Sequence, residues 1–212
     1  MKTILAYGDS LTWGFDAEGH GRHPREVRWP SVLAEALGPD VEVIADGLNG
    51  RATAYDDWTA DCDRNAARTL PTALHAHAPL DLVILMLGTN DMKSHVAGSA
   101  VAATRGMRRL IELVDRHAWP FPYDTPQVLI VAPPPIVETA DPDLGALFAG
   151  AREQSAMLAS FYADLADETG VGFFDAGSVA RSSSVDGVHL DAANTVAIGR
   201  GIAPIARLML GL

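Results

Sequence analysis

Short apolar runs alternate along the chain with longer segments that have helical periodicity. The runs at 82–87 and 128–131 are continuously apolar, which is typical of strands covered on both faces. Strands that alternate with helices favour a parallel sheet. We therefore predict an α/β fold whose strands lie at 3–7, 41–45, 82–87, 128–132 and 171–174.

The segments between these runs carry Ala, Leu, Glu and Arg at helical spacing. Pro133–Pro135 cannot continue a central strand, so the strand before them ends at 132. Asp191 is suited to cap the final helix, and Pro204 predicts a kink or a restart within it. We predict helices at 29–37, 66–78, 98–118, 146–169 and 192–210.

The composition is that of one ordinary globular domain. The chain has 212 residues, of which 48% are hydrophobic and 20% are charged. It contains neither a Ser/Gly-rich linker nor an internal repeat, so we expect a single domain over residues 1–212. Cys62 is the only cysteine, which excludes an intrachain disulfide and a cysteine-based zinc site.

The charge balance argues against two classes of partner. With 27 acidic and 16 basic residues the formal net charge is -11, the wrong sign for neutralising nucleic-acid phosphates. The longest apolar run, 82–87, is far short of the roughly 20 residues that a membrane span needs. Met1–Tyr7 leads directly into a polar turn and leaves no room for a signal peptide, so we expect a soluble cytoplasmic protein.

Polar residues follow the ends of the predicted strands, where ligands bind in open α/β sheets. Ser10 comes directly after the first strand, close to the start of a helical turn whose positive end favours a nucleophile. A serine hydroxyl needs a base to remove its proton, and that base needs a group to orient it. Asp186 and His189 supply such a pair at a spacing of three residues.

Acyl transfer also needs donors for the oxyanion of the tetrahedral intermediate. Gly50, after the second strand, can present its backbone N–H, and Asn90, after the third, can offer its side-chain NH2. Together with the N–H of Ser10 they would form an oxyanion hole with three donors. Gly47 competes with Gly50 for this role, and each feature alone is also common in ordinary turns.

In combination, these residues resemble the four motif blocks of the SGNH (GDSL-type) hydrolase superfamily. The blocks are Gly8-Asp9-Ser10-Leu11, Gly50, Gly88-Thr89-Asn90-Asp91 and Asp186-x-x-His189, in that order. The resemblance implies a flavodoxin-like three-layer sandwich with a five-stranded parallel sheet. It also implies a catalytic triad of Ser10, His189 and Asp186, and an oxyanion hole formed by Ser10, Gly50 and Asn90.

Longer matches make the chain similar to a bacterial subgroup of arylesterases and acyltransferases with perhydrolase activity. This similarity implies hydrolysis of short-chain aryl or small alkyl esters through an acyl-enzyme, with acyl transfer or perhydrolysis as further activities. It also implies a small-molecule ester as the partner and a homo-oligomer, while the segment 16–24 departs from the subgroup. The matches are 8–14, 27–29, 80–84, 86–91, 173–178 and 185–189.

Other signals change this picture little. Trp13 can line the substrate pocket, or it can belong to the core or an interface. His75 and His77 point to different faces of a helix, and the acidic stretch 56–63 lacks the pattern of a calcium loop, so we expect no metal. Neither a dinucleotide-binding nor a phosphate-binding glycine motif occurs, and the mechanism needs no cofactor.

Several alternatives stay open at this point. Arg51 can meet an acidic substrate group or pair with a nearby aspartate, and Lys93 and His95 can lie on the pocket rim or on plain surface. The main rival activity is a carbohydrate or lipid deacylase of the same superfamily. A catalytically inert flavodoxin-like binding module is the rival from a different class, although such a module has no use for Asp186 and His189 at this spacing.

Overall fold

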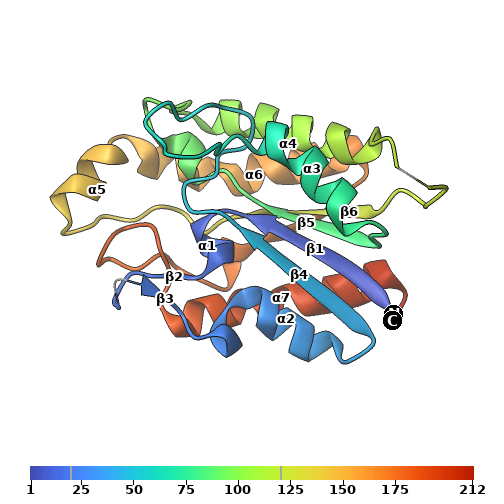
Figure 1. Ribbon diagram of the computed structural model, residues 1–212. Helices are drawn as coiled ribbons and strands as arrows, with labels where there is room; N and C mark the ends of the chain where they lie inside the picture. Colours follow the sequence, from blue (N-terminus) through green and yellow to red (C-terminus); the bar gives the residue numbers. More distant parts are fainter. Residues whose placement is uncertain (20, 120) are drawn as a thin grey trace.

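Five parallel strands form the central sheet of the computed structural model, which describes residues 1–19, 21–119 and 121–212 (Figure 1). The registers of neighbouring strands are all parallel. All predicted strands are therefore confirmed, with end points that differ by at most a few residues. In spatial order the strands are β4 (Val41–Gly47), β1 (Lys2–Gly8), β5 (Leu82–Met86), β6 (Gln127–Ala132) and β7 (Gly172–Asp175).

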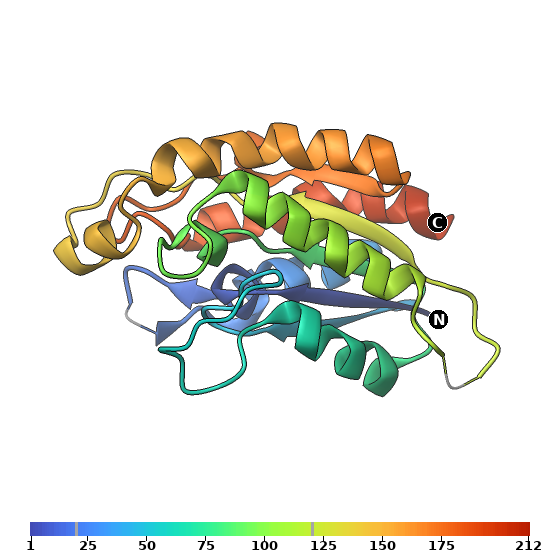
Figure 2. The ribbon, with the colours of Figure 1, turned by 90° about the horizontal axis from the view of Figure 1, so that it is seen from above.

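Helices cover both faces of this sheet (Figures 1 and 2). Along β5, Val83 and Leu85 pack into one apolar cluster with α3, α4 and α6, whereas Ile84 and Met86 pack into another with α2 and α7. Because both faces are buried, the strand has to be apolar at every position, as its sequence is. The helices are α2 (Trp29–Leu37), α3 (Ala66–His77), α4 (Ala100–Asp115), α6 (Ala151–Thr169) and α7 (Ala192–Leu210).

The prediction of one helix over 146–169 is wrong. The segment contains the end of a short helix, α5 (Pro142–Leu147), and the whole of α6. Gly150, directly before α6, has a φ of 77°, a left-handed conformation that an α-helix cannot continue through. The break turns α5 away from the helical layer and places it beyond the carboxyl ends of the strands (Figure 1).

The restart predicted at Pro204 does not occur, because α7 runs through this residue as one helix. Pro204 and Arg200, whose carbonyl would otherwise accept the missing hydrogen bond, both lie on the exposed side of the helix. Water can therefore satisfy the freed carbonyl. The predicted cap is confirmed, since the Asp191 side chain accepts a hydrogen bond from the Asn194 N–H.

Several short elements that the periodicity did not predict gather at the carboxyl edge of the sheet (Figure 1). A run of two to four residues is too short to show a period. The short elements are α1 (Ser10–Trp13), the antiparallel pair β2 (Phe15–Asp16) and β3 (Gly21–Arg22), and the 3-10 turns η1 (Arg25–Val27), η2 (Asn90–Met92) and η3 (Ala176–Ser178).

Among the described residues, no helix is long and apolar enough to cross a membrane.

Candidate active site

A tight turn at the end of β1 places Ser10 at the first position of α1. Asp9 caps this short helix, since its Oδ1 accepts a hydrogen bond from the Leu11 N–H at 3.0 Å. Gly8 permits the turn, because a Cβ there would lie only 2.1 Å from Oγ1 of Thr12 and 2.7 Å from the carbonyl oxygen of Met86. The first N–H groups of a helix have no partner within it, so the Ser10 N–H stays available at this edge.

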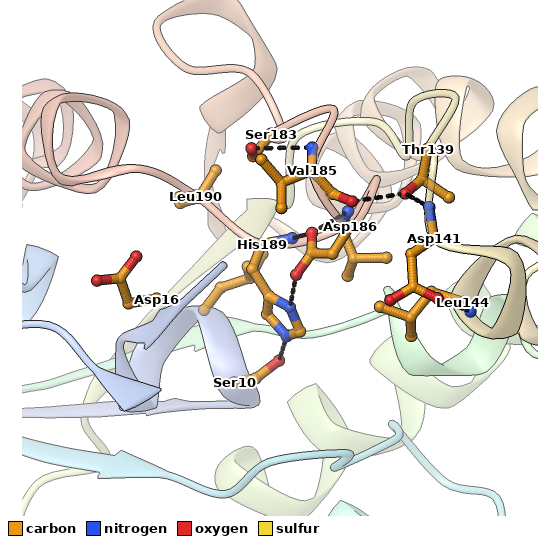
Figure 3. Close-up of polar contacts among 12 residues, drawn as sticks. Ser10, Asp16, Thr139, Asp141, Leu144, Ser183, Val185, Asp186, His189 and Leu190 are labelled. Carbon is orange, nitrogen blue, oxygen red and sulfur yellow. Dashed lines mark hydrogen bonds and ion pairs between the residues drawn. The ribbon is translucent and has the colours of Figure 1, made fainter. Parts of the chain in front are cut away.

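Ser10, His189 and Asp186 form one continuous chain of hydrogen bonds (Figure 3). Nε2 of His189 lies 2.9 Å from Oγ of Ser10, and its Nδ1 lies 2.6 Å from Oδ2 of Asp186. Oδ1 of Asp186 accepts the N–H groups of Val188 at 2.9 Å and of His189 at 2.8 Å. Residues that are far apart in the sequence thus have the arrangement that a nucleophile, a base and an orienting acid would need.

The loop that carries His189 and Asp186 is anchored at several points. The N–H of Ser183 donates to the carbonyl of His189, and the N–H of Gly187 donates to the carbonyl of Ser183. The Val137 N–H donates to the carbonyl of Gly187, and the Thr139 hydroxyl donates to that of Val185 (Figure 3). The loop is therefore tied to the segment that follows β6 and held across the site from Ser10.

The electrostatic surroundings keep Asp186 ionised. Burial acts to raise the pKa of its carboxyl, but the hydrogen bonds from the His189 ring and the Val188 N–H outweigh burial and hold this pKa below its ordinary value. An ionised carboxylate accepts the Nδ1–H of His189 and stabilises the imidazolium that forms when the base takes a proton.

The three predicted oxyanion donors lie around Ser10. Gly50 follows β4 in a turn with a φ of 82°, and Asn90 opens η2 after β5. Within the described residues, the N–H groups of Ser10 and Gly50 donate no hydrogen bond. Nδ2 of Asn90 makes long hydrogen bonds to Oδ2 of Asp9 at 3.3 Å and to the Arg51 carbonyl at 3.2 Å. These contacts orient the amide and leave it able to shorten a bond to a stronger acceptor.

Two buried carboxyls lie behind these donors. Burial raises the pKa of Asp9 to about 6, although the Leu11 N–H and His189 act in the opposite direction. Burial likewise raises the pKa of Asp91 to about 6, against the hydrogen bonds that it accepts from Thr53. Asp91 holds the chain after Gly50 in place, so the loops after β4 and β5 are coupled through this carboxyl.

A pocket of about 160 Å³ opens onto Ser10 and His189. Trp13 is not among the residues that line it. Phe15 occupies the position expected for that ring, with its centroid 4.2 Å from the centroid of the His189 imidazole. The β2–β3 pair holds Phe15 there, since Asp16 also forms a bridge with Leu190. The lining residues are Ser10, Phe15, Asn49, Gly50, Arg64, Asn90, Lys93, Leu144, Leu147, Phe148, Val188 and His189.

Arg51, beside Gly50, pairs with a nearby aspartate and does not line the pocket. Arg51 pairs with Asp46 at 2.8 Å, donates to the carbonyl of Gly8 and lies over the ring of Tyr7 at 3.9 Å. Lys93, in contrast, lines the pocket, and His95 lies 3.5 Å from Asp57 outside it.

The acidic stretch is largely paired with arginines. Asp56 and Asp63 contact Arg68, and Asp57 and Asp61 contact Arg64. No group of three or more His, Cys, Asp or Glu side chains suited to a metal occurs in the part of the chain that the structure describes. The stretch therefore serves to position the two arginines.

Comparisons with known proteins identify a family for this chain. The GDSL-like Lipase/Acylhydrolase family matches residues 6–194. A comparison with curated proteins finds no match.

Solved structures match over nearly the whole length. A carbohydrate acetylesterase family member from Sinorhizobium meliloti is 63% identical, with a TM-score of 0.99 and 100% of each chain covered. The aryl esterase of M. smegmatis is 41% identical, with a TM-score of 0.94 over 99% of this chain and 100% of the other. A second carbohydrate acetylesterase from Sinorhizobium meliloti is 39% identical, with a TM-score of 0.93 over 98% and 100%.

Proposed function

This chain belongs to the GDSL-like lipase/acylhydrolase family and is a carboxylic ester hydrolase, and we propose that it cleaves short-chain esters through an acyl-enzyme on Ser10. The preferred substrates in this proposal are small-molecule aryl or small alkyl esters. The superfamily that the motifs resemble and the arylesterase-like similarity are confirmed by the family match and the structural relatives.

The observation that carries the proposal is the hydrogen-bonded chain from Ser10 through His189 to Asp186. Nδ1–H of His189 donates to Asp186, which leaves Nε2 free to accept the Ser10 proton. As the proton moves, Oγ of Ser10 attacks the ester carbonyl carbon, and the carbonyl oxygen becomes the oxyanion. Donors from Ser10, Gly50 and Asn90 would stabilise this charge.

The intermediate then collapses. The bond between the carbonyl carbon and the leaving oxygen breaks, and the His189 imidazolium gives its proton to the departing alcohol or phenol. Water next loses a proton to Nε2 of His189 and attacks the acyl-enzyme. Breakdown of the second tetrahedral intermediate releases the acid and returns the proton to Oγ of Ser10.

The size and lining of the pocket support short acyl groups. Its volume of about 160 Å³ is below the ~300 Å³ at the lower end of ordinary ligand pockets. Leu144, Phe148 and Val188 form an apolar side that suits a methyl or propyl group. An apolar side also disfavours water, so transfer of the acyl group to an alcohol or to hydrogen peroxide is a further activity of this proposal.

A second candidate substrate class is acetylated carbohydrate. One of the similar solved structures, 63% identical to this chain, is a carbohydrate acetylesterase family member, and another is a carbohydrate acetylesterase. The same Ser10 chemistry would remove an acetyl group from a sugar hydroxyl. Lipid deacylation is less suited to a pocket of this volume. A cytoplasmic location and a homo-oligomer stay predictions.

The test compares the wild type with Ser10→Ala on p-nitrophenyl acetate, butyrate, octanoate and palmitate. We expect hydrolysis that falls from acetate to palmitate, and a loss of about 10³-fold or more in Ser10→Ala, which removes the nucleophile. Added ethanol should yield an ethyl ester if acyl transfer occurs. Equal rates for both proteins on every ester would contradict the proposed nucleophile, and a preference for palmitate would contradict the proposed acyl size.

A further inference from the structure

One side of the catalytic pocket is cationic, although the chain as a whole carries a net charge of -11. Asn49, Arg64 and Lys93 form this side, which we name the polar wall. Among the described residues, no aspartate or glutamate lines the pocket. The remaining lining groups are apolar or belong to the proposed catalytic machinery, so the positive charge of the polar wall is not explained by the reaction.

Lys93 is a buried cation that makes no direct ion pair among the described residues. The residue is only 8% exposed, and within the described residues its ammonium group makes neither a hydrogen bond nor an ion pair. Its Nζ lies 5.6 Å from the centroid of the Phe148 ring, which also lines the pocket. Burial lowers the pKa of Lys93 and Arg64 acts in the same direction, whereas the nearby carboxylates of Asp57, Asp9 and Asp91 act in the opposite direction without contacting the ammonium group. An unpaired buried charge is costly for folding, which favours a role in binding.

Arg64 adds a second cation beside the oxyanion donors. A Cβ placed on Gly50 would lie 2.8 Å from Nη1 of Arg64, so the guanidinium packs directly over this glycine. Nη1 lies 3.8 Å from Oδ2 of Asp57, whose side chain is 3% exposed, and Nη2 lies 3.3 Å from Oδ1 of the exposed Asp61. These contacts are long for arginine and carboxylate, and they hold the guanidinium from behind without satisfying it.

Two buried polar atoms of the wall also lack partners. Nε of Arg64 and Oδ1 of Asn49 make no hydrogen bond within the described part of the chain. Most buried polar atoms in native proteins are hydrogen-bonded, so the free N–H of Arg64 Nε points to a ligand with an acceptor oxygen, whereas Oδ1 of Asn49 is itself an acceptor and can pair only with a donor on the ligand. Cations and N–H donors together select a negatively charged oxygen group, and the planar fork of arginine matches a carboxylate.

We propose that the polar wall binds a carboxylate carried by the alcohol part of the ester, so that the enzyme prefers anionic esters over neutral esters of the same shape. This inference rests on the proposed function, in which the acyl group is short and uncharged. The charge must then lie on the leaving alcohol or phenol. Lys93 and Arg64 are specificity-determining residues in this scheme, and the apolar side of the pocket receives the acyl group.

The test uses 4-acetoxybenzoate and 4-acetoxybenzamide, which differ mainly in the charge of one group. The charge preference is the ratio of their kcat/KM values, each divided by the rate of uncatalysed hydrolysis. We expect a preference of about tenfold or more for the benzoate, the effect of one charge-assisted hydrogen bond. Lys93→Met should lower this ratio about tenfold, whereas Lys93→Arg should retain most of it.

The chain provides a matched control, because Lys2 is its only other lysine. Lys2 pairs with Asp81 at 2.7 Å, at the amino end of the sheet and away from the pocket. Lys2→Met makes the same change in net charge and should leave the preference unaltered. Lys93→Met replaces an unpaired buried charge by an apolar group of similar length, so its thermal unfolding should not occur at a lower temperature than that of the wild type.

The outcomes separate the two proposals. In one outcome the wild type hydrolyses both esters, Ser10→Ala hydrolyses neither, and the charge preference is near one and unchanged in Lys93→Met. That outcome overturns the carboxylate site and leaves the proposed esterase in place. If neither ester is hydrolysed, calorimetric titration with benzoate decides. Binding that weakens in Lys93→Met supports the site, and absent binding or binding of unchanged affinity overturns it.

Discussion

The catalytic loop, residues 183–191, and the polar wall of the same pocket differ in whether their buried polar atoms are hydrogen-bonded. Both carboxylate oxygens of Asp186 accept hydrogen bonds, and backbone bonds tie the loop to the segment after β6. In the polar wall, by contrast, Nε of Arg64 and Oδ1 of Asn49 have no partner within the described residues. Hydrogen bonds to polar atoms fix the geometry of a loop, whereas buried polar atoms without a hydrogen bond can bind a ligand. In the two proposals made above, the same pocket therefore separates the chemistry from the selection of substrate.

The most informative substitution in the catalytic loop is Asp186→Asn. The oxygen of the new amide can still accept the N–H groups of Val188 and His189, so the loop should keep its shape. Its NH2, however, faces Nδ1 of His189 and favours the tautomer in which Nε2 carries the proton and cannot accept the one from Ser10. We expect kcat to fall by about 10³- to 10⁴-fold on p-nitrophenyl acetate.

A melting curve and the acetylation of Ser10 in single turnovers check this result. The variant should unfold at nearly the wild-type temperature and form the acyl-enzyme slowly. A decrease in kcat of less than tenfold would show that Asp186 does not orient the base.

Asn90→Ala removes one proposed oxyanion donor while the hydrogen-bonded chain from Ser10 to Asp186 remains. We expect kcat to fall by about 10²- to 10³-fold with little change in KM, because the donor acts mainly on the transition state. Asn90→Asp is the matched variant, since it keeps the shape but replaces the NH2 group by an acceptor, and it should lose at least as much activity. Steady-state kinetics measure both, and unchanged kcat values would remove Asn90 from the oxyanion hole.

Features that depend on neighbours in sequence were predictable. The strands and the helix over 29–37 follow from apolar patterning, and the cap at Asp191 follows from local side-chain chemistry. Ser10, Asp186 and His189 could be chosen because motif order and the carboxyl-edge rule point to the same place. The structure brings these three within hydrogen-bonding distance of one another.

Features that depend on the direction of a side chain were not predictable. Trp13 and Phe15 are both aromatic and two residues apart, and only the β2–β3 pair decides that Phe15 faces His189. Arg64 lies on a loop and lines the pocket, and the ion pairs of its guanidinium with Asp57 and Asp61 set the direction of its side chain. A pattern of residue types contains no information on which of several cations faces inward.

Asp9 lies behind the proposed oxyanion donors, and its buried carboxyl accepts a hydrogen bond from Asn90. Its pKa in the folded protein is about 6, against 3.8 without burial. The folded state therefore binds the proton more tightly, and this contribution to stability is complete below about pH 3.8 and is lost as the pH rises through about 6. Above that range, ionised Asp9 should cost about 3 kcal/mol relative to its protonated form.

Asp9→Asn should abolish this dependence. The difference in unfolding free energy between the variant and the wild type should shift in favour of the variant as the pH rises from about 4 to about 8. Urea unfolding at several pH values measures that difference. A difference that stays constant with pH would show that Asp9 does not titrate in this range.

The smallest expected effect concerns the apolar side of the pocket. Leu144, Phe148 and Val188 also line a second cavity of about 330 Å³, so these side chains divide two spaces. Phe148→Ala should join the spaces and raise the ratio of kcat/KM for p-nitrophenyl octanoate over acetate by about tenfold, the lower end of the roughly 1–3 kcal/mol that one methylene group contributes when it finds a site. Leu147→Ala is the control, because of these two cavities Leu147 lines the catalytic pocket and not the second one. If both variants change the ratio equally, the dividing wall does not limit acyl length, and the limit lies at the mouth of the pocket.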